Sequence, residues 1–285
     1  MSAPSASRWD DLRPRIVTGG VLIAAGITVI SLGGAVFATT AALVTGIMIW
    51  ELSRMIDKTA FIPALILGGL TVISVLVARQ MGPVGIAALL CVPAIAGALL
   101  LRRHMTIFAV YALGITLAGF GLALFRDDYG VVWLFWLVIV VASTDIAGYF
   151  AGRIFGGPKF WPSISPKKTW SGIVAGWISA VLVSFVFLAI TDAGRDLIWI
   201  SAVLSFASQM GDIAESAVKR RMGVKDSSNL LPGHGGLFDR FDGLLGASLF
   251  LLLTALVVDG TEPATFDDAT HFDIWCDRIH RTKYT

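Results

Sequence analysis

Residues 131–150 read VVWLFWLVIVVASTDIAGYF, and Asp145 is the only charged residue among them. A helix needs about 20 mostly apolar residues to cross the hydrocarbon core of a bilayer. The apolar residues here are continuous, whereas a strand of a membrane β-barrel would alternate between apolar and polar residues. The stretch therefore predicts a transmembrane helix in which one carboxylate is embedded.

Eight further apolar stretches of comparable length occur along the chain. They are residues 16–38, 39–55, 61–78, 84–101, 107–125, 172–190, 197–214 and 243–258. Only a tight turn around residues 32–37 separates the first two. The sequence therefore predicts an all-α, polytopic integral membrane protein with eight to nine transmembrane helices.

The composition of the 285-residue chain points to the same fold class. Hydrophobic residues make up 56% of the chain and charged residues 15%, whereas about 25% of the residues of a soluble domain are charged. This excludes a disordered chain, a nucleic-acid-binding tail and a typical soluble enzyme. The two cysteines are too few for a disulfide framework.

The distribution of basic residues predicts how the chain is oriented. With nine spans and a cytoplasmic N-terminus, 16 of the 22 lysines and arginines fall in inner segments and three in outer loops. Such a bias is what the positive-inside rule predicts. We expect a protein of the bacterial inner membrane whose functional site faces the cytoplasm, and whose polar start, residues 1–15, leads into a retained signal-anchor.

Composition also divides the chain into three parts. Residues 1–130 are expected to form N-terminal transmembrane helices, and residues 131–258 a transmembrane region with cytoplasmic-face loops that carries the residues suited to catalysis. Residues 259–285 are expected to form a polar, solvated or disordered tail. Residue types that can bind metal occur in this tail at a spacing that fits no standard zinc site, namely His271, Asp273, Cys276 and His280.

Carboxylates occur at the predicted ends of several spans. Ionisable groups inside a span are costly and by default indicate function, and Asp145 and Asp212 lie in such positions. Glu215 shares a helix face with Asp212, and Asp239 and Asp242 come just before the last span. Pairing with a nearby lysine or arginine explains Glu215 and Asp242 equally well. Oxygen ligands without histidine or cysteine partners suit Mg²⁺, whose coordination shell substrate phosphates complete.

The longest inner loop, residues 219–242, begins with basic residues, ends with acidic ones and contains Pro-Gly-His-Gly-Gly at 232–236. Glycines allow backbone N–H groups to approach phosphate oxygens, and lysines or arginines neutralise these oxygens. The Gly-Lys-Ser/Thr ending of a Walker A loop is missing, and a flexible turn would have a similar composition. Together with Mg²⁺ ligands, this loop indicates that a soluble nucleotide meets a lipid at the inner face.

A third cluster follows Asp145. Gly148, Gly152 and Gly156 recur every four residues, a spacing that allows helices to pack closely. The run Ser-Pro-Lys-Lys-Thr at 165–169 opens the next span, where the N–H groups of a helix N-terminus attract anions. A basic turn that only obeys the positive-inside rule would look similar, so both explanations stay open.

The inner loop and its flanks resemble the signature of the phosphatidate cytidylyltransferases, also called CDP-diacylglycerol synthases. The matching positions span 27 residues and are Ser216, Lys219, Arg220, Lys225, Asp226, Pro232, His234, Gly235, Gly236, Asp239, Arg240 and Asp242. Residues 145–156 and 165–170 resemble the second motif of that family. The resemblance covers residues 143–246, whereas the first 130 residues match only in being apolar helices.

The resemblance implies that phosphatidic acid attacks the α-phosphorus of CTP, giving CDP-diacylglycerol and pyrophosphate. It implies that Asp212 and Asp239 hold a metal pair, Mg²⁺ with a second cation such as K⁺, and that Lys219 and Asp145 take part in catalysis. Substrate binding is implied for Ser165, Lys167, Lys168, Thr169, Ser216, Arg220, Lys225, His234, Gly235, Gly236 and Arg240. The expected partners are CTP, phosphatidic acid, the bilayer and a second copy of the chain in a homodimer, and nucleic acid is not among them.

Two departures from the family and two other functions are part of this interpretation. The tail, residues 260–285, has no counterpart in the family. The family often has Glu where Ser171 stands, which argues against a charge role at this position. A CTP-dependent lipid kinase would leave CDP and a phosphorylated alcohol instead of pyrophosphate. A membrane cation transporter would use Asp145 and Asp212, although transporters often show internal repeats with broken helices, and the sequence shows none.

Overall fold

The computed structural model describes residues 12–101, 104–231 and 235–259. Along the chain, five helices are followed by a two-stranded hairpin and three more helices. The expected signal-anchor start up to residue 11 and the predicted tail from residue 260 lie outside the described residues.

The chain forms two compact units, each made of two separate segments. Of the described residues, the first unit contains those up to Thr116 and those within Lys219–Phe241, and the second contains Leu117–Val218 and those from Asp242 to Asp259. The division of the sequence at residues 130 and 258 stays a prediction.

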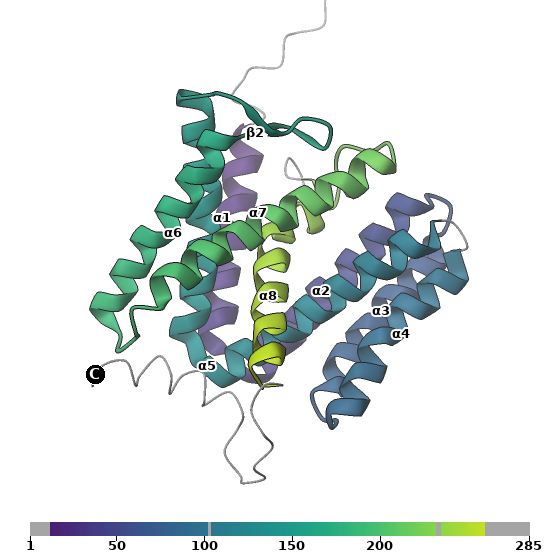
Figure 1. Ribbon diagram of the computed structural model, residues 1–285. Helices are drawn as coiled ribbons and strands as arrows, with labels where there is room; N and C mark the ends of the chain where they lie inside the picture. Colours follow the sequence, from purple (N-terminus) through teal and green to yellow (C-terminus); the bar gives the residue numbers. More distant parts are fainter. Residues whose placement is uncertain (1–11, 102–103, 232–234, 260–285) are drawn as a thin grey trace, which may run out of the picture. The chain divides into compact units, whose positions relative to one another are not determined.

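The first unit consists mainly of helices that follow one another along the chain. They are α1 (Leu12–Leu32), α2 (Gly34–Ile56), α3 (Phe61–Ala78), α4 (Pro83–Leu101) and the start of α5 (Met105–Ile154). Helix α2 packs against α3, and α3 packs against α4 (Figure 1). A Cβ at Gly46 would lie 2.7 Å from the carbonyl oxygen of Gly68, so α2 and α3 touch through their backbones.

The break between the first two helices corrects the predicted boundary at residue 38. Helix α1 ends at Leu32 and α2 begins at Gly34. Gly33 and Gly34 have φ values of 61° and 50°, a backbone conformation that glycine adopts without the steric penalty of a side chain. The predicted tight turn is therefore confirmed, but it is shorter than expected.

The second unit contains the later part of α5, the hairpin of β1 (Lys159–Trp161) and β2 (Ser165–Thr169), α6 (Trp170–Ile190), and most of α7 (Leu197–Arg221) and α8 (Phe238–Asp259). Helix α5 joins two predicted spans into one helical element with a break at Gly130, where φ is 81°. The antiparallel hairpin leads directly into α6 (Figure 1). It was not predicted from the sequence. The rings of Phe160 and Trp170 lie edge to face at 4.8 Å and close its base.

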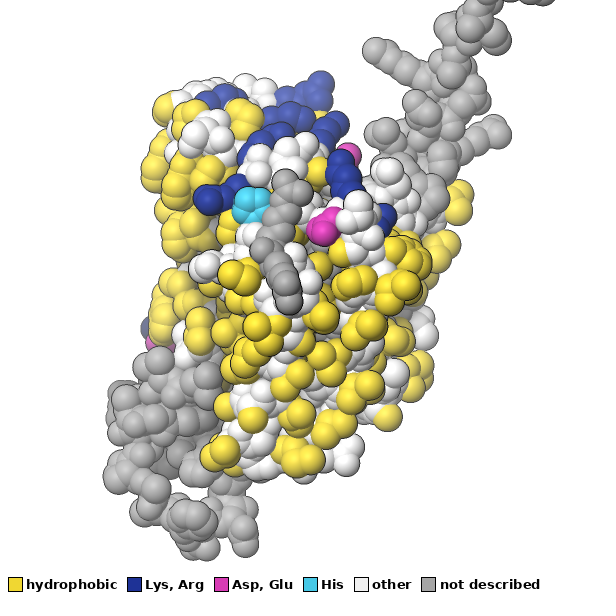
Figure 2. Space-filling model, turned by 90° about the vertical axis from the view of Figure 1, so that its right-hand side faces the viewer, with side chains coloured by type: hydrophobic (Ala, Val, Ile, Leu, Met, Phe, Trp, Pro, Cys, Tyr) yellow, Lys and Arg dark blue, Asp and Glu magenta, His cyan; other side chains and the backbone are white. Residues whose placement is uncertain are grey.

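The surface of the protein is that of a membrane protein. Six helices in the described part of the chain are long and apolar enough to cross a membrane: α2, α3, α4, α5, α6 and α7. Large apolar side chains point outward, such as Val84 with 85% and Ile62 with 68% of their surface exposed. Figure 2 shows hydrophobic side chains over much of the visible face. The prediction of an all-α, polytopic membrane protein is confirmed.

Candidate functional site

Helices α7 and α8 approach each other at glycines in the second unit. A Cβ at Gly211 would lie 2.3 Å from the carbonyl oxygen of Asp242, and a Cβ at Gly246 would lie 2.4 Å from that of Ala207. No side chain fits at such distances, so both positions need glycine for the two backbones to touch. This crossing brings the later turns of α7 beside the first turns of α8.

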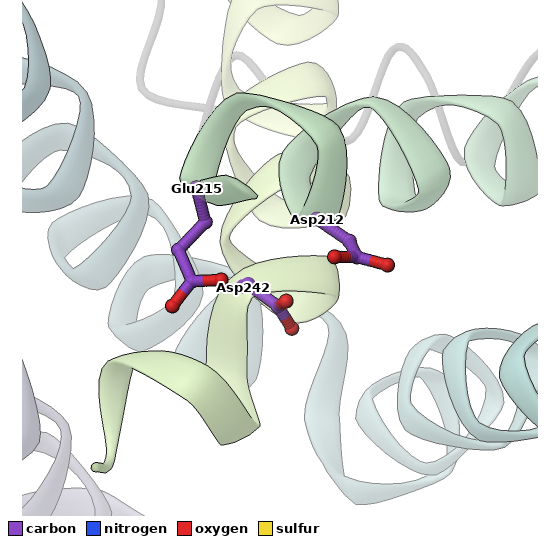
Figure 3. A group of neighbouring side chains, drawn as sticks. All are labelled: Asp212, Glu215 and Asp242. Atoms are coloured by element: carbon purple, nitrogen blue, oxygen red, sulfur yellow. The ribbon is translucent and has the colours of Figure 1, made fainter. Parts of the chain in front are cut away.

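Three carboxylates meet at this crossing (Figure 3). Asp212 and Glu215 come from α7 and Asp242 from α8, and one oxygen atom of each lies within 4.8 Å of the others. Glu215 is buried, while Asp212 and Asp242 are partly exposed. Such a set of hard oxygen donors fits a divalent cation like Mg²⁺.

A lysine from the hairpin stands beside the carboxylates. The Nζ atom of Lys168 lies 2.6 Å from Oδ2 of Asp212 and donates a hydrogen bond to the carbonyl oxygen of Gln209 at 3.3 Å. The hydroxyl of Ser216, one turn further along α7, donates to Oδ1 of Asp212 at 3.4 Å. Asp212 is thus held between a cation and a hydroxyl while about a third of its side chain (32%) stays exposed.

Gln209 fixes α6 against α7 near this site. Its amide nitrogen donates to the carbonyl oxygen of Ile173 at 3.2 Å, and its amide oxygen accepts from the indole of Trp177 at 3.2 Å. Gln209 is buried, so both halves of its amide are satisfied where an unpaired polar group would be costly. These bonds hold the start of α6, and with it Lys168, close to Asp212.

The glycines of the third sequence cluster pack α5 against α6. A Cβ at Gly172 would lie 2.6 Å from the carbonyl oxygen of Gly148, and a Cβ at Gly152 would lie 2.9 Å from the hydroxyl of Thr169. The close-packing explanation therefore holds for Gly148 and Gly152. Gly156, with a φ of 60°, instead lies at the start of the loop to the hairpin.

Thr169 and Ser171 shape the beginning of α6. The hydroxyl of Thr169 accepts a hydrogen bond from the backbone N–H of Gly172 at 3.3 Å and caps the helix. Ser171, which stands where the family often has Glu, donates to the carbonyl oxygen of Gly156 at 2.5 Å. The serine therefore ties α6 to the loop before the hairpin.

The inner loop forms a second polar cluster, which belongs to the first unit. The Nζ atom of Lys219 lies 2.7 Å from Oδ1 of Asp239. Oδ2 of Asp239 accepts hydrogen bonds from the backbone N–H and the hydroxyl of Ser227 and from the backbone N–H of Gly236, each at 2.8 Å. Both oxygens of Asp239 therefore have donors from the loop, and its side chain is 5% exposed.

Sequence reasoning missed Glu51, a fully buried residue of α2 that binds this same loop. The hydroxyl of Ser228 donates to its carboxylate at 2.6 Å, and the backbone N–H of Phe238 donates at 2.7 Å. Glu51 is the only acidic residue in the predicted span 39–55, which also contains Arg54. This is the signal that singled out Asp145 and would have identified Glu51 as well.

The other predicted site residues lie in several places. Ser165 and Lys167 are on β2, with Lys167 exposed, and Asp145 is on α5, outside the group of three carboxylates. Gly235 has a φ of 80°, which favours glycine. Among the predicted substrate-binding residues of the inner loop, Arg220, Lys225 and Arg240 are also exposed.

Two predictions fall on residues outside the described part of the chain. The first is the role of His234 in substrate binding, and the second concerns the histidines and the cysteine of the tail. Asp212 belongs to the second unit and Asp239 to the first, so their pairing as metal ligands stays a prediction.

The fold and the site define a class of protein: a polytopic, all-α membrane protein in which a cluster of carboxylates and a lysine gathers where helices meet a short hairpin. The chain belongs to the cytidylyltransferase family, because the model of that family matches residues 13–258.

Curated relatives agree with this membership. The chain is 47% identical over 149 residues to the phosphatidate cytidylyltransferase of Brucella suis, covering 50% of this chain and 55% of the relative. It is 41% identical over 128 residues to the phosphatidate cytidylyltransferase of Bacillus subtilis, covering 44% and 48%. It is 40% identical over 147 residues to that of Mycobacterium bovis, covering 48% and 46%. The chain thus spans about half the length of the curated relatives it matches.

Proposed function

We propose that this protein transfers the cytidylyl group of CTP to phosphatidic acid, giving CDP-diacylglycerol and pyrophosphate. The observation that carries the proposal is the cluster of Asp212, Glu215 and Asp242 with Lys168 beside it, in a membrane protein of the cytidylyltransferase family. A polyphosphate needs both a metal site and cations around it, and the cluster offers both. The names of the curated relatives support the same reaction.

Asp212, Asp242 and Glu215 would hold Mg²⁺. When bound, this cation supplies charge neutralisation at the phosphates and makes the α-phosphorus of CTP easier to attack. The donor set fits this role because it consists only of carboxylate oxygens. The metal pair implied for Asp212 and Asp239, Mg²⁺ with a second cation such as K⁺, stays a prediction from the resemblance.

Residues of this chain bind and orient the substrates in the proposed reaction. An oxygen of the lipid phosphate forms a bond to the α-phosphorus of CTP, and the bond between the α-phosphorus and the bridging oxygen to the β-phosphate breaks, releasing pyrophosphate. The attacking phosphate is already anionic, so no strong base is needed. Lys168 and Asp212 are both partly exposed, so the ammonium can turn from this carboxylate to a phosphate oxygen.

The location of the site follows from the same proposal. The excess of lysine and arginine in the inner segments supports a bacterial inner membrane protein whose carboxylate cluster faces the cytoplasm, where CTP is found. The homodimer stays a prediction.

The assay for this function uses purified full-length protein, phosphatidic acid vesicles, MgCl₂ and CTP labelled at either the α- or the γ-phosphate. We expect the α-label in a lipid product and the γ-label in pyrophosphate. With diacylglycerol added to the vesicles as an alcohol acceptor, the γ-label in a lipid would instead show a CTP-dependent lipid kinase. Cation flux into proteoliposomes without CTP, and no lipid product, would show a transporter.

The lysine beside the cluster gives a specific prediction. Lys168→Met keeps much of the apolar length of the side chain but removes its charge. We therefore expect kcat/KM for CTP to fall about 10- to 100-fold, which is the effect of losing one charge-assisted hydrogen bond. Initial rates at varied CTP concentration measure this change. The control is Lys159→Met, an exposed lysine on β1 of the same hairpin, and an equal effect of both changes would contradict the role of Lys168.

The choice between Asp239 and Asp242 as metal ligand can also be measured. We expect Asp242→Asn to raise the Mg²⁺ concentration at half-maximal rate about tenfold, since a neutral amide binds Mg²⁺ less well than a carboxylate. We expect Asp239→Asn to weaken CTP binding without this change in Mg²⁺ dependence, since Asp239 holds Lys219 and the loop. The opposite pattern would support the metal pair implied by the resemblance.

A further inference from the structure

A single carboxylate from α2 organises the inner loop. Oε1 of Glu51 accepts hydrogen bonds from the hydroxyl of Ser228 at 2.6 Å and from the backbone N–H of Leu237 at 3.0 Å. Oε2 accepts from the backbone N–H of Phe238 at 2.7 Å and lies 3.3 Å from the hydroxyl of Ser227, whose single proton it shares with Asp239. Glu51 thus binds both ends of the segment that contains the Gly-rich stretch, from 176 to 187 residues away in the sequence.

The close approach of the loop to Glu51 explains one of its glycines. A Cβ at Gly236 would lie 2.4 Å from Oε1 of Glu51 and 2.0 Å from the hydroxyl oxygen of Ser227. Any side chain at this position would push the loop away from the carboxylate. Glycine is therefore required at position 236 because the loop lies so close to Glu51. The same glycine would also allow the backbone to approach a phosphate.

Ser227 links Glu51 to the charged pair of the loop. Its hydroxyl lies within hydrogen-bonding distance of Glu51 and, at 2.8 Å, of Asp239, which in turn binds Lys219 at 2.7 Å. The described residues therefore form a continuous polar network from the interior of α2 to the ammonium of Lys219. A buried network of this kind holds one conformation when all of its members are satisfied.

We propose that Glu51 is a positioning residue of cytidylyl transfer, which holds the inner loop in the conformation that presents Lys219 and the neighbouring basic side chains to the phosphates of CTP. This inference rests on the proposed function. Glu51 acts through the loop and makes its contacts with Ser227, Ser228 and the start of α8.

The test uses Glu51→Gln, which keeps the shape of the side chain. Each oxygen of Glu51 accepts one backbone N–H, from Leu237 or from Phe238. Glutamine has one oxygen, so in either orientation its NH₂ group faces one of these N–H donors and leaves it without an acceptor. The matched control is Ser53→Ala, two residues further along α2, because Ser53 is equally buried and its hydroxyl donates to the carbonyl oxygen of Ile49 in its own helix.

Two measurements compare Glu51→Gln with Ser53→Ala in the full-length protein. We expect kcat/KM for CTP to fall about 10- to 100-fold, as for a catalytic group displaced by roughly 1 Å, mainly through a higher KM for CTP with little change in the KM for phosphatidic acid. We also expect the backbone amides of residues 227–231 and 235–241 to exchange hydrogen for deuterium faster, while those of α3 keep their protection.

The outcomes separate this inference from the proposed function. Equal kinetics in Glu51→Gln and Ser53→Ala would overturn the positioning role, even if the loop exchanged faster, because Glu51 would then be a structural anchor alone. A protein that makes no CDP-diacylglycerol without any substitution would overturn the proposed function, and the inference with it.

A second variant covers the case in which Glu51→Gln does not fold. Ser228→Ala removes one of the four donors and leaves the carboxylate in place. We expect this variant to raise the KM for CTP about three- to tenfold, which is the change in affinity that the loss of one hydrogen bond causes. A KM equal to that of Ser53→Ala would overturn the proposal.

Discussion

Replacing Asp212 by asparagine is expected to lower the rate of cytidylyl transfer about a thousandfold, the size of effect that a preorganised electrostatic group has in catalysis. The amide keeps the shape of the side chain but removes the negative charge that faces Lys168 at 2.6 Å and would bind Mg²⁺ together with Asp242. Initial rates at saturating CTP and phosphatidic acid measure the loss. A parallel titration with Mg²⁺ is expected to show a higher concentration at half-maximal rate.

A carboxylate of the same region that lies outside the cluster serves as the control. Asp196 directly precedes α7 and accepts a hydrogen bond from the indole of Trp199 at 3.1 Å. We expect Asp196→Asn to keep the rate and the Mg²⁺ dependence of the unaltered protein. If Asp212→Asn kept them too, the assignment of the carboxylate cluster as the metal site would be wrong.

The second large effect is expected from Gly211→Ala at the crossing of α7 and α8. The new methyl group would lie 2.3 Å from the carbonyl oxygen of Asp242 and 2.9 Å from the Cα atom of Gly246, both of which are backbone atoms that cannot rotate away. The helices must therefore separate, which costs about 1–3 kcal/mol of unfolding free energy, as for other overpacked interiors. Asp242 then moves away from Asp212, and about 1 Å of such movement is expected to cost roughly a hundredfold in rate.

Gly69→Ala on α3 is the matched control for this substitution. Gly69 is also in a helix, but nothing lies within 4 Å of a Cβ at this position. Alanine there is expected to leave the unfolding free energy unchanged or slightly higher, because alanine favours helices more than glycine does. Denaturation in mixed micelles and initial rates measure both variants. Similar stability and activity of the two would show that α7 and α8 do not need their backbone contact.

The positions of the helices could be predicted closely from the sequence. The stretches predicted at 61–78, 84–101 and 197–214 correspond to α3, α4 and most of α7. This succeeded because a helix that crosses a bilayer needs about 20 consecutive, mostly apolar residues, and such a run can be recognised from local composition. The breaks at Gly33 and Gly130 were harder to place, since a glycine can stay in a helix or take a positive φ, and its context decides.

The hairpin before α6 was missed for a different reason. It has only three residues in one strand and five in the other, too few for the alternation of apolar and polar residues to indicate a strand. Lys167 and Lys168 of its second strand were predicted as site residues all the same. Only the structure shows that Lys168 pairs with Asp212 while Lys167 is exposed.

The sequence by itself determined that this is a helical membrane protein with few charges, and which of these charges are candidates for chemistry, because both conclusions depend on the types of residues and their local spacing. The tertiary structure alone decided which candidates lie close together. Asp212 joins Asp242 because Gly211 and Gly246 let two helices touch, and Glu51 binds a loop more than 170 residues away. Such contacts depend on the packing of distant segments, which local patterns in a sequence do not contain.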